Sequence, residues 1–244
     1  DMLSRMKAKL DAGRSLLYQT ARYVDIYKCL EDIARDRKLT PEERQELKKY
    51  TRLADAFTPL AKGMNSEYAN QNAYDAISVH GGSGFIMEYK CQRLYRDARI
   101  FSSDEGTTQR QVVAAIRYIT NGTYLSIIKE MLDNAVAPEL QGLKERTAAL
   151  VEKLEEAVAK VKEANNQCVQ DFLARRLYEI TADVIMSLLI LDDATRAPEL
   201  FTKSANVYVR HAEAEVNAHH NFIMNFRAED IEFYKAQENA AAEA

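Results

Sequence analysis

Two short stretches of the sequence combine residue types and spacings that could do chemistry. In the first, Gly81 to Gly84 (GGSG), a backbone with few side chains can approach a ligand closely and present N–H groups, a geometry that favours phosphate. The second, Ser103 to Thr107 (SDEGT), places capping residues and the Glu105 carboxylate at the start of an expected helix. Such a carboxylate can act as a base, or it can simply interact with the helix dipole.

Spacing alone leaves both alternatives open. No strand precedes the glycines and no Gly-Lys-Ser/Thr sequence follows them, so they form neither a Rossmann fingerprint nor a P-loop. A glycine-rich turn between two helices is the commoner explanation for the cluster. His80, beside the glycines, is interpreted as a packing or hydrogen-bonding residue. Arg93 and Asp97 are four residues apart, so we expect them to pair on one helix face.

No metal site is predicted from the sequence. His211, His219 and His220 lie close together, with Glu215 four residues before His219. A di-iron bundle would need Glu-x-x-His from two helices, and that motif is missing. We therefore interpret the three histidines as part of a solvated helix face.

The elements that must position these stretches are expected to be helices. The 244 residues include only 8 Gly and 4 Pro, against about 29 expected from average usage. A sandwich or a doubly wound α/β protein would need many more turn residues. Apolar residues at three-to-four spacing predict helices over the ranges 2–36, 41–79, 107–134, 139–164, 166–191, 197–225 and 228–238.

Local signals refine these boundaries. Thr40, Pro41 and Glu43 form a capping box with proline at the first helical position. Pro59 is expected to bend or break the second helix. The segment 133–138 is the predicted domain boundary, because a helix ends before a proline and the charge balance changes there.

The predicted fold class is therefore all-α, an up-down helical bundle over residues 1–137 followed by a second antiparallel helical bundle over 138–244. Residues 1–137 carry 21 Lys and Arg against 18 Asp and Glu, whereas residues 138–244 carry 12 against 19. Neither part concentrates positive charge as a nucleic-acid-binding protein does. The acidic second part also disfavours anionic lipid.

Membrane and compartment signals are weak. No apolar stretch approaches 18 residues, so no membrane insertion is expected. The cysteines Cys29, Cys91 and Cys168 form no CxxC pair, which favours a reducing compartment and a cytoplasmic location.

Several motifs, in order and spacing, resemble the C-terminal helical domain of acyl-CoA dehydrogenases. They are the runs Asp75 to Phe85 (DAISVHGGSGF), Glu88 with Tyr89, Arg93 to Ile100 (RLYRDARI) and Glu105 to Gln109 (EGTTQ). The resemblance covers roughly residues 1–135. The region beyond residue 138 resembles, more weakly, the helical extension of larger family members.

The resemblance implies a flavoprotein oxidoreductase of fatty acid metabolism that removes the α and β hydrogens of an acyl-CoA thioester. In this family a carboxylate takes the α-proton, hydride passes to FAD, and electrons leave to an electron-transfer flavoprotein. The matching motif places the base at Glu105, and Gly106 beside it is expected at the substrate.

The same resemblance implies cofactor contacts. Thr107 and Gln109 match positions that contact the flavin. Ser78, Gly81 and Gly82 match a segment that meets the ADP part of FAD from the neighbouring subunit of a homo-oligomer. Two positions depart from the family pattern, because Ser78 stands where Gln is frequent and Asp104 stands where Tyr commonly precedes the base.

The family also has a middle β-domain, and this sequence has no β-rich segment and begins at Asp1 without Met. We therefore expect a C-terminal fragment of a longer enzyme that is inactive alone. The alternative is a non-catalytic helical assembly module in which the motifs are vestigial. The acyl-chain length is not predicted, because part of the pocket would belong to the other domains.

Overall fold

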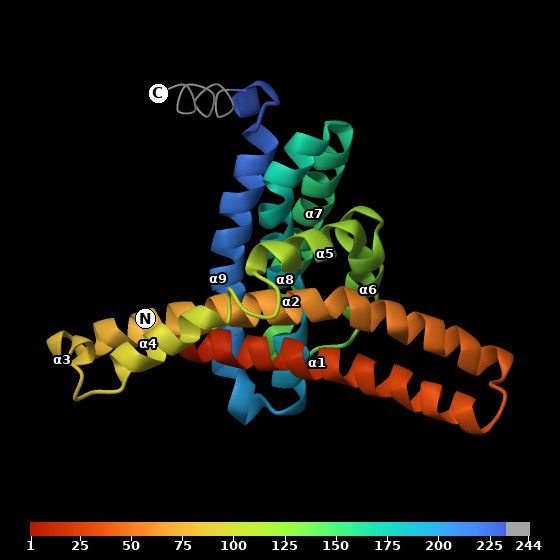
Figure 1. Ribbon diagram of the computed structural model, residues 1–244, viewed down its shortest axis with the longest axis horizontal. Helices are drawn as coiled ribbons and strands as arrows, with labels where there is room; N and C mark the ends of the chain where they lie inside the picture. Colours follow the sequence, from red (N-terminus) through yellow and green to blue (C-terminus); the bar gives the residue numbers. More distant parts are fainter. Residues whose placement is uncertain (233–244) are drawn as a thin grey trace.

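The computed structural model describes residues 1–232 and contains helices and their connections within that range (Figure 1). The helices are α1 (Met2–Asp36), α2 (Pro41–His80), α3 (Gly82–Phe85), α4 (Cys91–Ile100), α5 (Thr108–Thr120), α6 (Thr123–Leu132), the 3-10 helix η1 (Pro138–Leu140), α7 (Gln141–Glu163), α8 (Gln167–Arg196) and α9 (Pro198–Asn225). The predicted all-α fold is confirmed. None of these described helices is both long and apolar enough to cross a membrane.

Helices α1 and α2 form a long hairpin that crosses the molecule (Figure 1). The turn between them is fixed by the predicted capping box. Thr40 Oγ1 accepts a hydrogen bond from the backbone N–H of Glu43 at 3.2 Å, and Glu43 Oε2 accepts from the backbone N–H of Thr40 at 2.8 Å. Hydrogen bonds from Arg37 and Thr40 lower the pKa of Glu43 to about 2. The predicted helix boundaries at this turn are therefore confirmed.

The expected break at Pro59 is wrong, because α2 continues through it to His80, whereas a bend at this position stays a prediction. A proline inside a helix costs about 3 kcal/mol or more through its lost hydrogen bond and ring clash. Here Leu53, Phe57 and Leu60 are buried on both sides of the proline, so packing of the two halves against the core offsets that cost.

The predicted single helix over 107–134 is also wrong, because the chain turns between α5 and α6. Gly122 has a φ of 81°, in the left-handed region that favours glycine. The side-chain oxygen of Asn121 accepts from the backbone N–H of Thr123 at 3.0 Å and replaces a helical bond there. A local turn thus interrupts an apolar pattern that continues on both sides.

Helices α7, α8 and α9 form an antiparallel bundle that runs across the α1–α2 hairpin (Figure 1). They confirm the predicted helices over 139–164, 166–191 and 197–225, although α8 continues to Arg196. Of the short helix predicted over 228–238, residues 229–232 are helical and the remainder lies outside the described residues.

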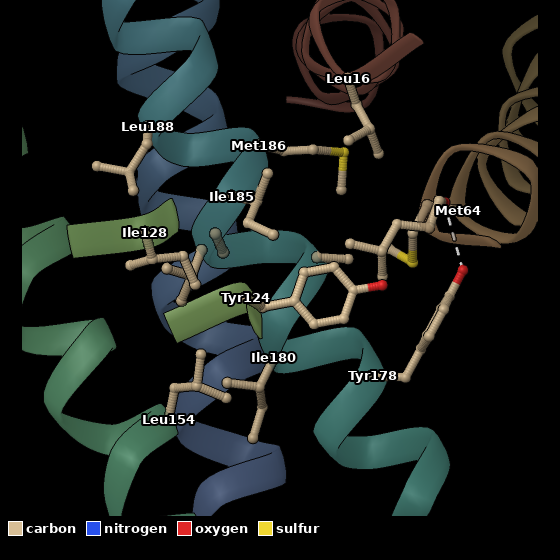
Figure 2. Close-up of a cluster of buried hydrophobic side chains, with 14 of the residues drawn as sticks. Leu16, Met64, Tyr124, Ile128, Leu154, Tyr178, Ile180, Ile185, Met186 and Leu188 are labelled. Carbon is tan, nitrogen blue, oxygen red and sulfur yellow. Dashed lines mark hydrogen bonds between the residues drawn. The ribbon is translucent and has the colours of Figure 1, made fainter. Parts of the chain in front are cut away.

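Helix α8 lies at the centre of the core. Every residue from Ile180 to Leu191 is buried, as expected for a helix with neighbours on all sides. Leu16, Met64, Tyr124 and Leu154 bring α1, α2, α6 and α7 into the same cluster (Figure 2). This cluster includes residues from both sides of the predicted domain boundary, and the boundary itself stays a prediction.

A buried polar cluster joins α2, α8 and α9. The carboxylate Oδ1 of Asp183 accepts hydrogen bonds from the Tyr208 hydroxyl at 2.9 Å and the Tyr68 hydroxyl at 3.1 Å. Asp183 is only 3% exposed. Burial raises its pKa to about 7, even though the two hydroxyls stabilise the charged form.

This raised pKa predicts a pH-dependent stability that Asp183→Asn removes. The pKa of an unfolded Asp is about 3.9, so the contribution of Asp183 is fully present below about pH 4 and is lost as the pH rises to about 7. Asparagine stays neutral and can accept the same hydrogen bonds. Urea unfolding between about pH 4 and about pH 7 should show a decline in the free energy of unfolding that is smaller in Asp183→Asn by roughly 4 kcal/mol. An identical decline in both proteins would contradict the prediction.

Candidate functional site

The loop between α4 and α5 carries Glu105 in an unusual backbone conformation. Glu105 has a φ of 50°, and Gly106 has a φ of 96°. A left-handed conformation costs a residue with a side chain about 1–3 kcal/mol and persists only where the surroundings enforce it. The loop ends at Thr107, whose hydroxyl caps α5 by accepting from the backbone N–H of Arg110 at 3.3 Å.

Polar contacts from α2 and α5 hold this loop in place. Lys62 Nζ donates to the backbone carbonyl of Asp104 at 2.8 Å and also to that of Phe101. Gln111 Nε2 donates to the carbonyl of Gly106 at 3.2 Å. The loop is therefore fixed at both ends of the turn that presents Glu105, whose carboxylate is exposed.

An apolar groove of about 700 Å³ leads to Glu105 between α1, α2 and the end of α4. Leu17 of α1, Ala61 and Ala69 of α2, and Ile100 of α4 contribute much of its apolar lining. Leu17 is 49% exposed and Ile100 is 54% exposed, so large aliphatic side chains face open space beside the carboxylate. The groove could accept an apolar chain.

A second groove, of about 750 Å³, lies on the α5 side of the same carboxylate. Glu105, Gly106, Thr107 and Gln109 all line it. Four of the site residues expected from the sequence are therefore brought together. Glu105 lines both grooves.

The other three predicted contact residues lie elsewhere. Ser78, Gly81 and Gly82 are exposed at the C-terminal end of α2. Ser78 follows Lys62 by sixteen positions on one helix, which corresponds to roughly 24 Å along its axis. A Cβ added at Gly81 or Gly82 would meet nothing within 4 Å, so the backbone there is open to a ligand.

Asp104 interacts with its own loop. Its Oδ1 accepts from the backbone N–H of Glu105 at 2.9 Å. The expected pairing of Arg93 with Asp97 is confirmed, with Nε 3.5 Å from Oδ2. His80 is confirmed as a hydrogen-bonding residue, because its Nδ1 lies 2.8 Å from the carbonyl oxygen of Ala76.

The interpretation of the three histidines as part of a solvated helix face is wrong. The side chains of His211, His219 and His220 are only 15–18% exposed. His219 Nε2 lies 3.0 Å from Glu179 Oε2, and His220 Nε2 lies 2.8 Å from Glu156 Oε2. Burial lowers the pKa of His211. These contacts cross between helices, so the periodicity of α9 alone did not indicate them.

Sequence reasoning missed Lys62 and Glu67, the two α2 residues whose side chains contact the site loop and the start of α5. Neither belongs to a motif with a fixed spacing to Glu105. The only available signal was charge, because Lys62 follows Ala61 and precedes Gly63 and Met64 in an otherwise mostly apolar part of α2.

The fold is that of the C-terminal helical domain of acyl-CoA dehydrogenases. Two family models match the chain: "Acyl-CoA dehydrogenase, C-terminal domain" over residues 37–118 and "Acyl-CoA dehydrogenase C terminal" over residues 120–231. Both descriptions name the same family. The two matches follow one another along the chain and together account for most of the sequence. The chain belongs to the acyl-CoA dehydrogenase family.

Individual relatives agree with this assignment. The chain is 33% identical over 110 residues to a subunit of the caffeyl-CoA reductase–Etf complex of Acetobacterium woodii, which covers 45% of this chain and 23% of that protein. It is 29% identical over 209 residues to butyryl-CoA dehydrogenase of Syntrophomonas wolfei, which covers 80% of this chain and 32% of that protein. The chain thus spans a third or less of the length of these relatives.

A solved structure has the same fold. The crystal structure of an acyl-CoA dehydrogenase complexed with FAD from Bacillus anthracis superposes with a TM-score of 0.67. The match covers 91% of this chain and 41% of that chain at 20% sequence identity. At this identity the likeness supports the fold alone.

The backbone conformation of Glu105 predicts an unusual order of stability. Glycine adopts positive φ without penalty, whereas alanine does not. The free energy of unfolding of Glu105→Gly should exceed that of Glu105→Ala by about 1 kcal/mol. At Asp104, where φ is not positive, the same pair provides the control, and glycine should be no better than alanine. Urea denaturation measures both pairs, and an alanine advantage at position 105 would contradict the prediction.

Proposed function

We propose that this chain supplies the catalytic base and one wall of the acyl pocket in an enzyme that dehydrogenates acyl-CoA thioesters between the α and β carbons. The observation that carries the proposal is that Glu105 lines two grooves. One groove is lined by Leu17 and Ile100, and the other by Thr107 and Gln109. An acyl chain in the first and a flavin at the second would place their reacting atoms beside one carboxylate.

The chemistry of Glu105 follows from this placement. Its carboxylate would take the proton from the α-carbon while hydride leaves the β-carbon, so that a carbon–carbon double bond forms and two electrons are accepted by the cofactor. A carboxylate in water is a weak base, but an acyl chain lying over it removes water and strengthens it. The N-terminus of α5 lies directly after the loop, and a helix N-terminus interacts favourably with a carboxylate such as that of Glu105.

The residues present fit a flavin dinucleotide. Thr107 and Gln109 offer a hydroxyl and an amide on one open groove. The backbone at Gly81 and Gly82 is open to a ligand, because a Cβ added at either position would have no atom within 4 Å. FAD, when bound, supplies the hydride acceptor. We propose that Thr107 and Gln109 orient its ring, and that Ser78 with the two glycines holds the ADP part of an FAD bound by a neighbouring subunit.

The proposal extends to partners beyond this chain. The similarity to a subunit of an Etf complex supports an electron-transfer flavoprotein as the electron acceptor. A cofactor shared between Ser78 and the neighbouring subunit would require a homo-oligomer. The three cysteines are free, which is compatible with a cytoplasmic enzyme.

Glu105→Gln in the full-length enzyme tests the assignment of the base. Glutamine keeps the size of the side chain but cannot accept the α-proton, so the rate of flavin reduction by acyl-CoA should fall by about 10²-fold or more. Stopped-flow bleaching of the flavin with saturated acyl-CoAs of several chain lengths measures this rate. Normal reduction in Glu105→Gln would refute the assignment, and a full-length protein that takes up no flavin would support the alternative of an assembly module.

The chain of 244 residues expressed by itself provides a second test. We expect it to fold as a helical protein and to remain colourless, because Thr107 and Gln109 lie in an open groove that can cover only one side of a flavin. Far-ultraviolet circular dichroism and the visible spectrum after incubation with FAD measure this. A yellow, stoichiometric complex would show that this domain alone holds the cofactor.

A further inference from the structure

Helix α2 holds the site loop at two points, and the second is less obvious than the first. Besides the Lys62 contacts, Glu67 Oε1 accepts a hydrogen bond from Thr108 Oγ1 at 2.6 Å. Thr108 is 6% exposed and is the first residue of α5, three positions after Glu105. Its backbone N–H also donates to the carbonyl of Ser102 at 3.1 Å, which closes the loop on itself. The side chain of Thr108 is thus the fixed end of the segment that presents the carboxylate.

The other oxygen of Glu67 faces a different helix. Glu67 Oε2 lies 3.7 Å from Arg175 Nη2 on α8. Arg175 Nε is 2.8 Å from Glu179 Oε1, and Glu179 Oε2 is 3.0 Å from His219 Nε2 on α9. A continuous series of hydrogen bonds and ion pairs therefore runs from α5 through α2 to α8 and α9. Within it, Glu67 links Thr108 of α5 to Arg175 of α8.

The two contacts of Glu67 require a carboxylate at this position. Thr108 donates a hydrogen bond to Oε1, and the ion pair of Oε2 with Arg175 needs a negative charge on Glu67. A glutamine has one oxygen, which could still accept from Thr108, and a neutral NH₂ group that cannot pair with Arg175. An ionised acceptor also makes the shorter and stronger hydrogen bond to the hydroxyl.

We propose that Glu67 is a positioning residue, backed by Arg175, that fixes Thr108 and thereby sets the place of the Glu105 carboxylate relative to the substrate. This inference rests on the proposed function of Glu105. It gives the region beyond residue 138 a part in the reaction, although none of the residues described there, up to 232, lines either groove at the base. Small displacements matter at such a site, since a shift of about 1 Å can lower a rate about 10²-fold.

Thr108 offers a matched pair of substitutions that separates positioning from folding. In the full-length enzyme, Thr108→Val keeps the shape of the side chain and removes its hydroxyl, whereas Thr108→Ser keeps the hydroxyl. Stopped-flow flavin reduction should show a limiting rate about tenfold lower in Thr108→Val. The half-saturating acyl-CoA concentration should change by less than about twofold, and Thr108→Ser should stay near wild type.

Glu67 and Arg175 complete the test through non-additivity. Glu67→Gln should lower the rate less than Thr108→Val, because its amide oxygen can still accept from Thr108. The double variant should lose no more than Thr108→Val alone, because both changes act on the same contact. Arg175→Gln should lower the rate less than Thr108→Val does. The double variant Arg175→Gln with Glu67→Gln should be little slower than Glu67→Gln alone. Glu152→Gln, on an exposed position of α7, is the control carboxylate and should leave the rate unchanged.

The outcomes distinguish this inference from the proposed function. A wild-type enzyme that no acyl-CoA reduces, or a normal rate in Glu105→Gln, refutes the proposed function. If both behave as expected, a wild-type rate in Thr108→Val, or losses that multiply in the double variant with Glu67→Gln, overturns the positioning role. A wild-type rate in Arg175→Gln overturns the part assigned to α8.

Discussion

The structure depends first on the burial of α8 from every side. All positions from Ile180 to Leu191 are covered by other helices. Burying a large aliphatic side chain contributes about 1.5–3 kcal/mol, and α8 contributes a long series of them to one cluster. The same helix covers the apolar sides of α1, α2 and α6. The helices that carry the site and those of the extension therefore stabilise each other, whatever their order in the sequence.

Buried polar groups determine how these helices are aligned. Asp183 joins α2, α8 and α9 through two tyrosine hydroxyls, and Asp11 of α1 accepts from Ser204 Oγ of α9 at 2.5 Å. Ser15 of α1 donates to Asp193 of α8. An apolar surface tolerates sliding, whereas a buried carboxylate that loses its partner leaves a costly unpaired charge. These contacts favour one alignment of α1 against α8 and α9.

The sequence predicted the features that depend on local signals. The capping box at Thr40 needs only neighbouring residues, so the α1–α2 turn was found correctly. The Asn121–Gly122 turn was missed because the apolar periodicity continues across it. The helix break expected at Pro59 is absent because tertiary packing offsets the cost of the proline. Likewise the Glu105 motif is contiguous and could be recognised. Glu67 reaches Thr108 from 41 positions away and could not.

The strain at Glu105 explains why the core matters to the site. A left-handed Glu105 must be held, and Lys62 of α2 provides two of the contacts that hold it. The next residue, Gly63, lies against α8, because a Cβ there would be 2.1 Å from the Tyr178 hydroxyl. That hydroxyl donates to the carbonyl of Pro59 at 2.9 Å. The turn of α2 that holds the loop is thus itself held by α8. Part of the free energy gained by burying α8 therefore maintains the strained backbone of Glu105.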